Sequence, residues 1–449
     1  MKQYDVVVIG AGPGGYESAI ELGRAGLKTL LIDKSKERIG GTCLNEGCIS
    51  TKNYLQSAGY VSKANYFREC GVELEVQGLN LQRLRERTIS LKNELRSGVV
   101  WLLDNAKVET LYGTASFIDS HSVDVSGETI HFEKCIIATG AKSREISTLT
   151  VDGKHILSSR EIFELNTLPK SMAIIGGGPI GCEFATFFGA LGVEVTIIAR
   201  GAQLLSGEDE DISKTLLRAF KKSNIRVLTS ATVENAEVMD DAVQLRVGGE
   251  TQESIVCELV LCAIGRDPYT EGLNLKNAGV ELNSRGFIEV DTAFQTSQKH
   301  IYALGDCIDT PAFAHTAYAE ARIAARNLIR GTSHTNTHIN PSTIFTDPQI
   351  ASCGLSEKEA KERGIAIDVK KAFFKANAKA KINGDDAGFV KMIISLEGGT
   401  ILGASIIGVE ATEIIHEMII AVEKKLTSSE LTDMIHVHPS VSEIIRYLN

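Results

Sequence analysis

The sequence predicts an α/β fold in which one strand, turn, helix and strand unit occurs twice and a smaller α+β domain follows. Two observations support this prediction. A short apolar strand leads into a glycine-rich turn and a helix near residue 6, and the same order returns near residue 172. Further on, strands are expected at 366–374, 389–395 and 401–408, and helices at 411–424 and 427–434.

The first unit carries the fingerprint of a dinucleotide-binding turn. A strand at 6–9 is followed at once by a G-x-G-x-x-G sequence that begins at Gly10, and then by a helix. Glycines at this spacing let the backbone approach a pyrophosphate at the positive end of the helix. The next strand, at 29–32, ends in Asp33, whose carboxylate is placed to accept hydrogen bonds from an adenosine ribose.

The second unit repeats this order with a strand at 172–175, a G-x-G-x-x-G sequence from Gly176 and a strand at 193–198. One chain with two such units should bind two dinucleotides, which indicates electron transfer between a fixed flavin and a diffusible nicotinamide. Arg200 follows the last strand, where an NAD site usually has an acid. It would suit a 2′-phosphate, and the alternative is a solvated surface arginine. The coenzyme is therefore expected to be NAD or NADP.

Cys43 and Cys48 stand close together in the sequence, soon after the strand that closes the first unit. In a regular helix their side chains would point about 140° apart, because each residue advances by about 100°. A disulfide needs the two Cα atoms within roughly 4.4–6.8 Å, so a bridge requires an irregular turn, and Gly47 gives the backbone that freedom. The alternatives are a metal half-site and two unconnected buried thiols.

Several other residues stand at strand ends or near the carboxyl end. Apolar strands close on Gly140 and on Gly265, and Asp306 follows a third strand. Such an aspartate binds a cofactor hydroxyl or simply caps the next helix. His438 and Glu443 offer an acid–base group oriented by a carboxylate, or only an exposed histidine.

Composition and charge limit the partners and the compartment. A net charge of −10 disfavours nonspecific binding to nucleic acid or to an anionic membrane. No apolar run is long enough for a membrane span, and the amino terminus leads directly into a strand without a signal peptide, so a cytoplasmic protein is expected. Apart from Cys43 and Cys48, the cysteines are expected as core thiols: Cys70, Cys135, Cys182, Cys257, Cys262, Cys307 and Cys353.

With these motifs the chain resembles the class I pyridine nucleotide-disulfide oxidoreductases, the FAD-dependent glutathione reductase class, over essentially its whole length. Within that family it is most similar to the dihydrolipoamide dehydrogenases. The family pattern Gly-Gly-Thr-Cys-Leu-Asn-x-Gly-Cys-Ile matches residues 40–49. Further family elements match residues 138–140, 263–266, 305–306, 314–315, 345–351 and 436–443.

The resemblance implies two Rossmann-like dinucleotide-binding domains, for FAD and NAD(P), and a carboxyl-terminal α+β dimerisation domain. The expected boundaries are 1–145 for the first part of the FAD domain, 146–268 for the NAD(P) domain, 269–338 for the return to the FAD domain and 339–449 for the dimerisation domain. The residues implied to bind FAD are Gly10, Gly12, Gly14, Gly15, Asp33, Lys34, Gly41, Thr42, Lys52, Gly140, Asp306, Ala314 and His315. Those implied to bind the nicotinamide coenzyme are Gly176, Gly178, Ile180, Gly181, Glu183, Arg200 and Gly265. No metal site is expected.

The same resemblance implies a redox disulfide between Cys43 and Cys48 and the oxidation of protein-bound dihydrolipoamide to lipoamide. Cys43 would exchange with the substrate, Cys48 would contact the flavin, and Lys52 would lie near the flavin ring. His438 would act as the base, held by Glu443, and both would come from the other subunit of a homodimer. The implied partner is a lipoyl-bearing carrier protein or domain.

The sequence departs from the family pattern at a few positions. Glu46 stands between the cysteines, where the family commonly has a small apolar residue, and Ser50 and Thr51 replace the usual Pro-Ser. A carboxylate there should disfavour thiolate formation and alter the redox potential. Ala199 stands where the NAD-selecting glutamate is usual, and the second arginine of NADP-using relatives is replaced near Ser206.

Two alternative functions are considered. One is an NADPH-dependent disulfide reductase of the glutathione reductase type, which Arg200 suits, whereas His436 and the element at 314–315 favour lipoamide. The other is a non-catalytic flavoprotein subunit, against which the complete cysteine pair argues. A mercuric reductase or a large thioredoxin reductase would need a cysteine pair beyond Cys353.

Overall fold

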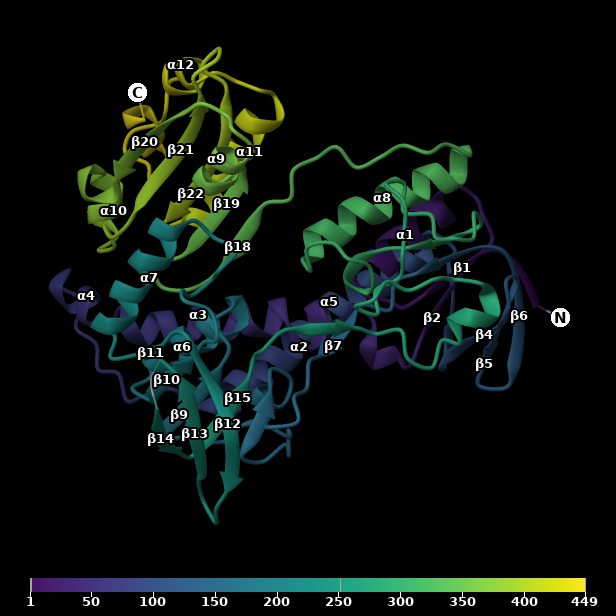
Figure 1. Cartoon of the computed structure of the whole chain (residues 1–449), viewed down its shortest axis with the longest axis horizontal. Helices are drawn as coiled ribbons and strands as arrows, with labels where there is room; N and C mark the ends of the chain where they lie inside the picture. The colour runs from purple at the N-terminus through teal and green to yellow at the C-terminus, as the bar shows by residue number, and fades with distance from the viewer. Residues whose placement is uncertain (1, 251, 449) are drawn as a thin grey trace. The chain divides into compact units, whose positions relative to one another are not determined.

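A computed structural model describes residues 2–250 and 252–448. The chain forms two compact units, each of them discontinuous in sequence (Figure 1). No helix in these two ranges is both long enough and apolar enough to cross a bilayer. The first unit comprises Met1–Thr51, Arg85–Arg144 and Gly265–Thr337, and the second unit comprises Lys52–Leu84, Glu145–Ile264 and His338–Asn449.

The first unit is built on a seven-stranded sheet in the order β3-β2-β1-β6-β5-β4, with β17 beside β6. Strand β1 runs parallel to β2 and β6, and β17 runs parallel to β6, whereas β4, β5 and β6 are antiparallel. Val7 and Val8 of β1 are both fully buried, as expected for a parallel strand covered on both faces. The strands are β1 (Lys2–Ile9), β2 (Thr29–Asp33), β3 (Glu109–Tyr112), β4 (Ala115–Asp119), β5 (Ser122–Val125), β6 (Glu128–Ile137) and β17 (Ile301–Ala303).

Helix α1 (Pro13–Arg24) starts directly after the glycine turn, with a proline in its first turn, where the missing N–H has no helical partner to lose. It packs against α8 (Ala314–Arg330), whose Ala321 and Ala324 are fully buried and allow the close approach. Helix α3 (Cys48–Ser62) begins in the first unit and continues into the second. The other elements are η1 (Lys36–Arg38), α2 (Gly41–Glu46), most of α5 (Leu81–Asn105), β7 (Ala141–Ser143), β16 (Arg266–Pro268), η3 (Leu275–Ala278) and η4 (Gly305–Cys307).

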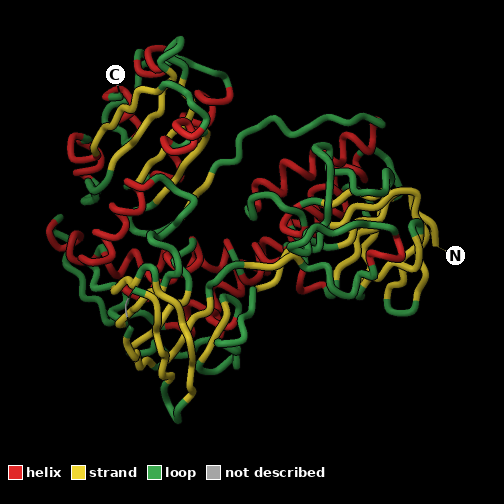
Figure 2. The backbone as a smooth tube through the Cα atoms, in the orientation of Figure 1, coloured by secondary structure: helices red, strands yellow, loops and turns green. Residues whose placement is uncertain are grey.

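The second unit contains the repeat of the first motif, in a parallel sheet of order β11-β10-β9-β15-β8. A separate antiparallel sheet of β12, β13 and β14 follows, and Figure 2 shows β12 and β13 as long strands joined by a short loop. The strands are β8 (Ile156–Ser158), β9 (Ser171–Ile175), β10 (Glu194–Ile198), β11 (Arg226–Leu228), β12 (Ala231–Val238), β13 (Val243–Gly249), β14 (Glu253–Cys257) and β15 (Leu259–Cys262). The helices are α4 (Ala64–Glu69), η2 (Glu161–Glu164), α6 (Pro179–Ala190) and α7 (Glu210–Lys222).

The carboxyl-terminal part of the second unit is an antiparallel sheet of order β18-β19-β22-β21-β20 with helices around it. Ile344 and Ile350 from this part share a hydrophobic core with Phe184 and Phe188 of α6. The strands are β18 (Ser342–Ile344), β19 (Ile350–Gly354), β20 (Ile367–Phe373), β21 (Phe389–Ser395) and β22 (Ile401–Ile407). The helices are α9 (Glu357–Glu362), η5 (Phe374–Ala376), α10 (Ala378–Ile382), α11 (Ala411–Glu423), α12 (Ser428–Thr432) and η6 (Ser442–Tyr447).

The elements predicted beyond residue 366 are present, within about two residues of their expected ends. The prediction that every other cysteine is a core thiol is wrong for Cys70, which is exposed just after the short helix α4, whereas the remaining six are buried. The segment Lys52–Leu84 groups with the second unit, although it was expected in the FAD domain. The domain boundaries themselves stay a prediction.

Candidate active site

Cys43 and Cys48 lie on successive helices of the first unit that meet at Gly47. Cys43 is in α2, and Cys48 is the first residue of α3. Gly47 has φ −137° and ψ −120°, outside the helical region, so the irregular turn predicted from the sequence is present. A Cβ at Gly47 would lie 2.8 Å from the carbonyl oxygen of Thr42, which leaves no room for a larger residue. Both cysteines are partly buried.

The cysteine segment is joined directly to the first glycine turn. The N–H of Gly40 donates to the carbonyl oxygen of Ala11 at 2.8 Å. Gly41 has φ +60°, and a Cβ there would lie 2.6 Å from the Cα of Gly12. Cys48 stands at the amino end of a 15-residue helix, and this position stabilises a thiolate. The cysteine pair therefore lies beside the turn that was expected to bind a dinucleotide.

The first glycine turn has the shape that a pyrophosphate requires. A Cβ at Gly10 would lie 2.4 Å from the carbonyl oxygen of Ala138, and one at Gly15 would lie 1.8 Å from the carbonyl oxygen of Gly10. These two glycines close the turn onto the sheet. A Cβ at Gly12, in contrast, would have its nearest neighbour, the Cα of Gly41, 3.9 Å away. That side of the turn is therefore open to a ligand at the amino end of α1.

Asp33 stands at the end of β2, as predicted, and orders the turn. Its Oδ2 accepts the N–H of Ala11 at 2.7 Å, and its Oδ1 accepts the N–H of Lys34 at 2.7 Å. The Nζ of Lys34 donates to the hydroxyl of Tyr269 at 2.5 Å and lies 4.0 Å from the centre of its ring. Tyr269 was not predicted, because it lies far from Lys34 in the sequence.

A polar cluster of Thr42, Arg266 and Asp306 lies in the same unit. The guanidinium of Arg266 donates to Oγ1 of Thr42 at 3.3 Å, and its Nε is 3.9 Å from Oδ2 of Asp306. Within the described residues that buried Nε has no hydrogen-bond partner, which indicates a ligand atom there. Burial raises the pKa of Asp306, and Arg266 opposes this shift. Asp306 does not cap α8, because Phe313 holds that position.

The remaining residues implied for FAD lie around two backbone turns of the first unit. Gly140 has φ +71°, and no atom lies within 4 Å of a Cβ placed there. Ala314 and His315 form the start of α8, and the His315 ring stacks on the ring of Phe313 with centroids 5.0 Å apart. The open side of Gly140 and the start of a helix are both suited to a long polar ligand.

Two tyrosines that were not predicted lie near the cysteines. The hydroxyls of Tyr16 in α1 and Tyr318 in α8 share a short hydrogen bond, and the ring centroids are 5.9 Å apart. Burial raises the pKa of Tyr16, and the bond to Tyr318 and the charge of Cys43 raise it further. Burial likewise raises the pKa of Tyr318, the bond from Tyr16 lowers it, and Cys43 and Cys48 raise it. The sulfurs therefore lie within electrostatic reach of this pair.

The second glycine turn, in the second unit, repeats the geometry of the first. A Cβ at Gly176 would lie 2.2 Å from the carbonyl oxygen of Ala263, and one at Gly181 would lie 2.1 Å from that of Gly176. No atom lies within 4 Å of a Cβ at Gly178. Ile180 is half-buried in the first turn of α6. Two glycines close the turn and one leaves it open, so a second dinucleotide fits here.

Lys52 and Glu183 form an ion pair inside the second unit. The Nζ of Lys52 lies 2.8 and 2.9 Å from the two carboxylate oxygens of Glu183, which is only 4% exposed. Glu183 also accepts the N–H of Phe345 at 2.9 Å, and the Phe345 ring lies 4.7 Å below the Lys52 Nζ. The structure thus brings together two residues that were expected to contact different cofactors.

The residues expected to select the coenzyme lie after β10. Arg200 is exposed, and Ala199 before it is buried. Gly265 belongs to the first unit, has φ +119°, and would place a Cβ 3.6 Å from Nη1 of Arg144. An exposed guanidinium at the end of β10 fits both interpretations of Arg200, a 2′-phosphate ligand and a solvated surface arginine, so the coenzyme preference stays a prediction.

His438 and Glu443 form a pair near the carboxyl end. The Nδ1 of His438 lies 2.9 Å from Oε2 and 3.2 Å from Oε1 of Glu443. The side chain of His438 is 67% exposed, whereas that of Glu443 in η6 is only 3% exposed. The N–H of Glu443 donates to Oγ of Ser440 at 3.2 Å. A buried carboxylate thus holds one nitrogen of an exposed imidazole and leaves the other free to take a proton.

The comparisons with known proteins cover nearly the whole chain. The sequence model of the pyridine nucleotide-disulphide oxidoreductase family matches residues 4–321, and that of its dimerisation domain matches residues 340–448. Dihydrolipoyl dehydrogenase of Geobacillus stearothermophilus is 35% identical over 446 residues, which cover 98% of this chain and 94% of that protein. Dihydrolipoyl dehydrogenase of Chlamydia trachomatis is 38% identical over 448 residues, which cover 99% and 95%.

Two solved structures resemble the chain over nearly their full lengths. LpdA from Mycobacterium tuberculosis has a TM-score of 0.92 at 26% identity and covers 100% of this chain and 99% of its own. The HOCl-induced flavoprotein disulfide reductase RclA from Escherichia coli has a TM-score of 0.89 at 30% identity, with 99% of each chain covered.

Two open glycine turns, with a cysteine pair beside the first, suit an enzyme that moves electrons between thiols, a flavin and a nicotinamide. The chain belongs to the pyridine nucleotide-disulphide oxidoreductase family. It is an FAD-dependent oxidoreductase that uses a pyridine nucleotide, and its carboxyl-terminal part is the family's dimerisation domain.

Proposed function

We propose that this enzyme oxidises dihydrolipoamide on a carrier protein to lipoamide and reduces NAD⁺ or NADP⁺. One observation carries the proposal. Cys43 and Cys48 lie on helices that break at Gly47, directly against the first glycine turn. The proteins that are 35% and 38% identical to this chain over almost its full length are dihydrolipoyl dehydrogenases.

The proposed chemistry is an exchange between a dithiol and a disulfide. One substrate thiolate attacks the sulfur of Cys43, so that its bond to Cys48 breaks and a mixed disulfide forms. The second substrate thiolate then displaces Cys43, which closes the substrate disulfide. The substrate loses two electrons, and Cys43 and Cys48 leave the step reduced. The amino end of α3 favours the thiolate form of Cys48.

His438 is the proposed base for this exchange. Thiolates are the nucleophiles, so a group must take the protons of the dithiol at neutral pH. Glu443 holds Nδ1 of His438 at 2.9 Å, which leaves Nε2 to accept a proton and stabilises the imidazolium that results. Glu443 is a positioning residue in this account, because it acts through His438.

A homodimer is the proposed catalytic unit, with His438 and Glu443 serving the cysteines of the partner. The exposed surface of the chain segment that leads to His438 supports this assembly. Ile435 is 99% exposed, and Val437 and Met434 are exposed as well, on a domain of the dimerisation type. Contiguous exposed apolar residues mark interaction surfaces, and a second copy of this chain would cover them.

Bound FAD would supply the acceptor for the electron pair of the reduced cysteines and the donor of a hydride to the nicotinamide. We assign its pyrophosphate to the first glycine turn, its ribose end to Asp33 and a polar atom to the buried Nε of Arg266. Lys52 is held by Glu183, so its charge is fixed in position. The second turn, open at Gly178, is the proposed site of the nicotinamide coenzyme.

The alternative is an NADPH-dependent disulfide reductase. The exposed Arg200 and the buried Ala199 favour a 2′-phosphate over the bare ribose, and a relative of similar fold is described as a flavoprotein disulfide reductase.

We also infer a reducing compartment such as the cytoplasm. The buried thiols that support this have pKa values raised by burial: Cys135, Cys182, Cys257, Cys262, Cys307 and Cys353.

Steady-state kinetics with purified FAD-loaded enzyme test the proposal. Dihydrolipoamide is offered with NAD⁺ and with NADP⁺, and oxidised glutathione is offered with NADH and with NADPH. Rapid oxidation of dihydrolipoamide with either coenzyme supports the proposed function. Turnover with glutathione and NADPH alone would favour the reductase, and FAD binding without any turnover would indicate a non-catalytic subunit.

A further inference from the structure

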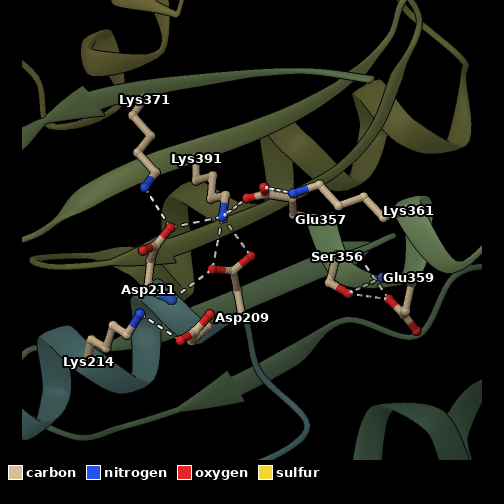
Figure 3. A network of polar contacts seen from close by, with 10 residues as sticks. Asp209, Asp211, Lys214, Ser356, Glu357, Glu359, Lys361, Lys371 and Lys391 are labelled. Atoms are coloured by element: carbon tan, nitrogen blue, oxygen red, sulfur yellow. Dashed lines mark hydrogen bonds and ion pairs between the residues drawn. The ribbon is translucent and has the colours of Figure 1, made fainter. Parts of the chain in front are cut away.

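Lys391 of β21 is a buried lysine surrounded by three carboxylates in the second unit (Figure 3). Its Nζ lies 2.8 Å from Asp209, 3.0 Å from Asp211 and 2.6 Å from Glu357, and its side chain is only 2% exposed. Although burial lowers the pKa of Lys391, its hydrogen bonds with the acids raise that pKa above its ordinary value, so the lysine is charged. Lys371 binds the same Oδ2 of Asp211 as Lys391, at 2.6 Å.

The cluster fixes the start of helix α7. Asp209 is the N-cap of α7, and its Oδ1 accepts the N–H of Asp211 at 2.9 Å. The same carboxylate accepts two hydrogen bonds from Lys391, at 3.0 and 2.8 Å. Lys391 therefore neutralises the buried cap and sets the position where the helix begins.

The preceding loop, residues 199–208, connects β10 to α7 and is held at two points in its second half. On one side the N–H of Leu205 donates to the carbonyl oxygen of Gly177 at 2.8 Å, inside the second glycine turn. On the other side Glu208 accepts the hydroxyls of Ser342 and Ser352, each at 2.7 Å. We call this segment the coenzyme loop, because it carries Ala199 and Arg200 at the end of β10.

We propose that Lys391 is a positioning residue for the nicotinamide coenzyme: through Asp209 it holds the coenzyme loop against the second glycine turn. The inference rests on the proposed binding of a pyridine nucleotide at that turn. A buried charged group of this kind is not explained by stability alone. An apolar core of similar volume is often as stable as a buried ion cluster or more so, whereas charged partners define one geometry.

The test compares Lys391→Met with wild type in the FAD-loaded enzyme. Methionine keeps most of the length of the side chain but leaves Asp209, Asp211 and Glu357 without the shared cation. The coenzyme KM and the dissociation constant of NADH or NADPH should rise about five-fold or more. The KM for dihydrolipoamide should stay within about two-fold, and so should the FAD content. Lys361→Met is the matched control, because Lys361 binds the same Glu357 at 2.6 Å but is largely exposed.

Glu208→Gln supplies a second variant in case Lys391→Met does not fold. It weakens the other anchor of the coenzyme loop without leaving a buried charge unpaired, and a smaller rise in the coenzyme KM is expected. The inference is overturned if Lys391→Met and Glu208→Gln both leave the coenzyme KM and the coenzyme dissociation constant within about two-fold of wild type. It is also overturned if the KM for the coenzyme and the KM for dihydrolipoamide rise together.

Direct measurement of coenzyme binding distinguishes this inference from the proposed function. A wild type that binds NADH or NADPH but does not oxidise dihydrolipoamide refutes the proposed reaction only, and one that binds neither overturns both.

Discussion

The carboxylate of Glu46 lies 3.0 Å from Nη2 of Arg38, and both side chains are partly buried in the first unit. Glu46 ends α2, one helical turn after Cys43, so the two side chains are neighbours on the helix surface. An acid at this position should disfavour the thiolate, and Arg38 offsets much of that effect. The ion pair explains how the chain carries a glutamate between its two cysteines.

Glu46→Gln should raise the reduction potential of the cysteine pair, because the remaining Arg38 charge stabilises the reduced, thiolate state. Arg38→Gln should lower it for the opposite reason, and the double variant should lie near wild type. Shifts of about 10–30 mV are expected. Equilibration of the purified enzyme with glutathione buffers, followed by thiol labelling, measures the potential. Shifts of the same sign in both single variants would contradict the account.

His438→Gln should lower kcat for dihydrolipoamide oxidation by about 10²–10⁴-fold, because no group is left to take the substrate protons. Glu443→Gln should lower it less, since an amide oxygen can still hold Nδ1 of His438. The pH profile of kcat/KM is the readout that a structural role would not move, and it should lose one ionisation in His438→Gln. His416→Gln, an exposed histidine on α11, is the control. An unchanged profile in His438→Gln would remove His438 from the mechanism.

Tyr318→Phe should destabilise the fold by about 1–3 kcal/mol, because the partly buried hydroxyl of Tyr16 loses its partner. The double change to phenylalanine at Tyr16 and Tyr318 should recover part of this loss, since no hydroxyl then stays unpaired. Urea unfolding measures the free energies. Tyr447→Phe is the control, because its hydroxyl lies in an exposed contact with Arg446. If the losses in free energy of unfolding of Tyr16→Phe and Tyr318→Phe simply add in the double variant, the two hydroxyls do not stabilise each other and the account is contradicted.

Glu320 gives a prediction for pH. It is buried on α8, its Oε2 accepts the N–H of Gly305 at 2.7 Å, and burial raises its pKa to about 6. An acid with a raised folded pKa stabilises the fold fully below about pH 4.5 and loses that contribution as pH rises through about 6. The Glu320→Gln variant avoids this loss of about 2 kcal/mol. Its stability relative to wild type should therefore increase between pH 4.5 and pH 7 in urea unfolding, and a constant difference would contradict the assignment.

Local patterns in the sequence predicted the elements that depend on neighbouring residues. The two glycine turns, Asp33 at a strand end and the irregular turn at Gly47 follow from spacing and backbone conformation alone. The strands near the carboxyl end followed from alternation of apolar residues.

Long-range partners could not be predicted in this way. Lys52 and Glu183 are separated by 131 residues, and Thr42 and Arg266 by 224. No local pattern marks such pairs, because the fold brings them together. The same holds for Lys391, whose charge in an otherwise apolar strand is explained by Asp209, Asp211 and Glu357. An isolated lysine at a buried strand position is the signal that would have indicated a partner.

The central claim is that Cys43 and Cys48 form the disulfide that a dithiol substrate reduces. Peptide mapping of the oxidised, FAD-loaded enzyme by mass spectrometry, before and after one equivalent of dihydrolipoamide without oxygen, tests it most directly. We predict a Cys43–Cys48 linked peptide that disappears on reduction, with both residues then alkylated. If the two residues are alkylated equally before and after dihydrolipoamide, the claim is wrong.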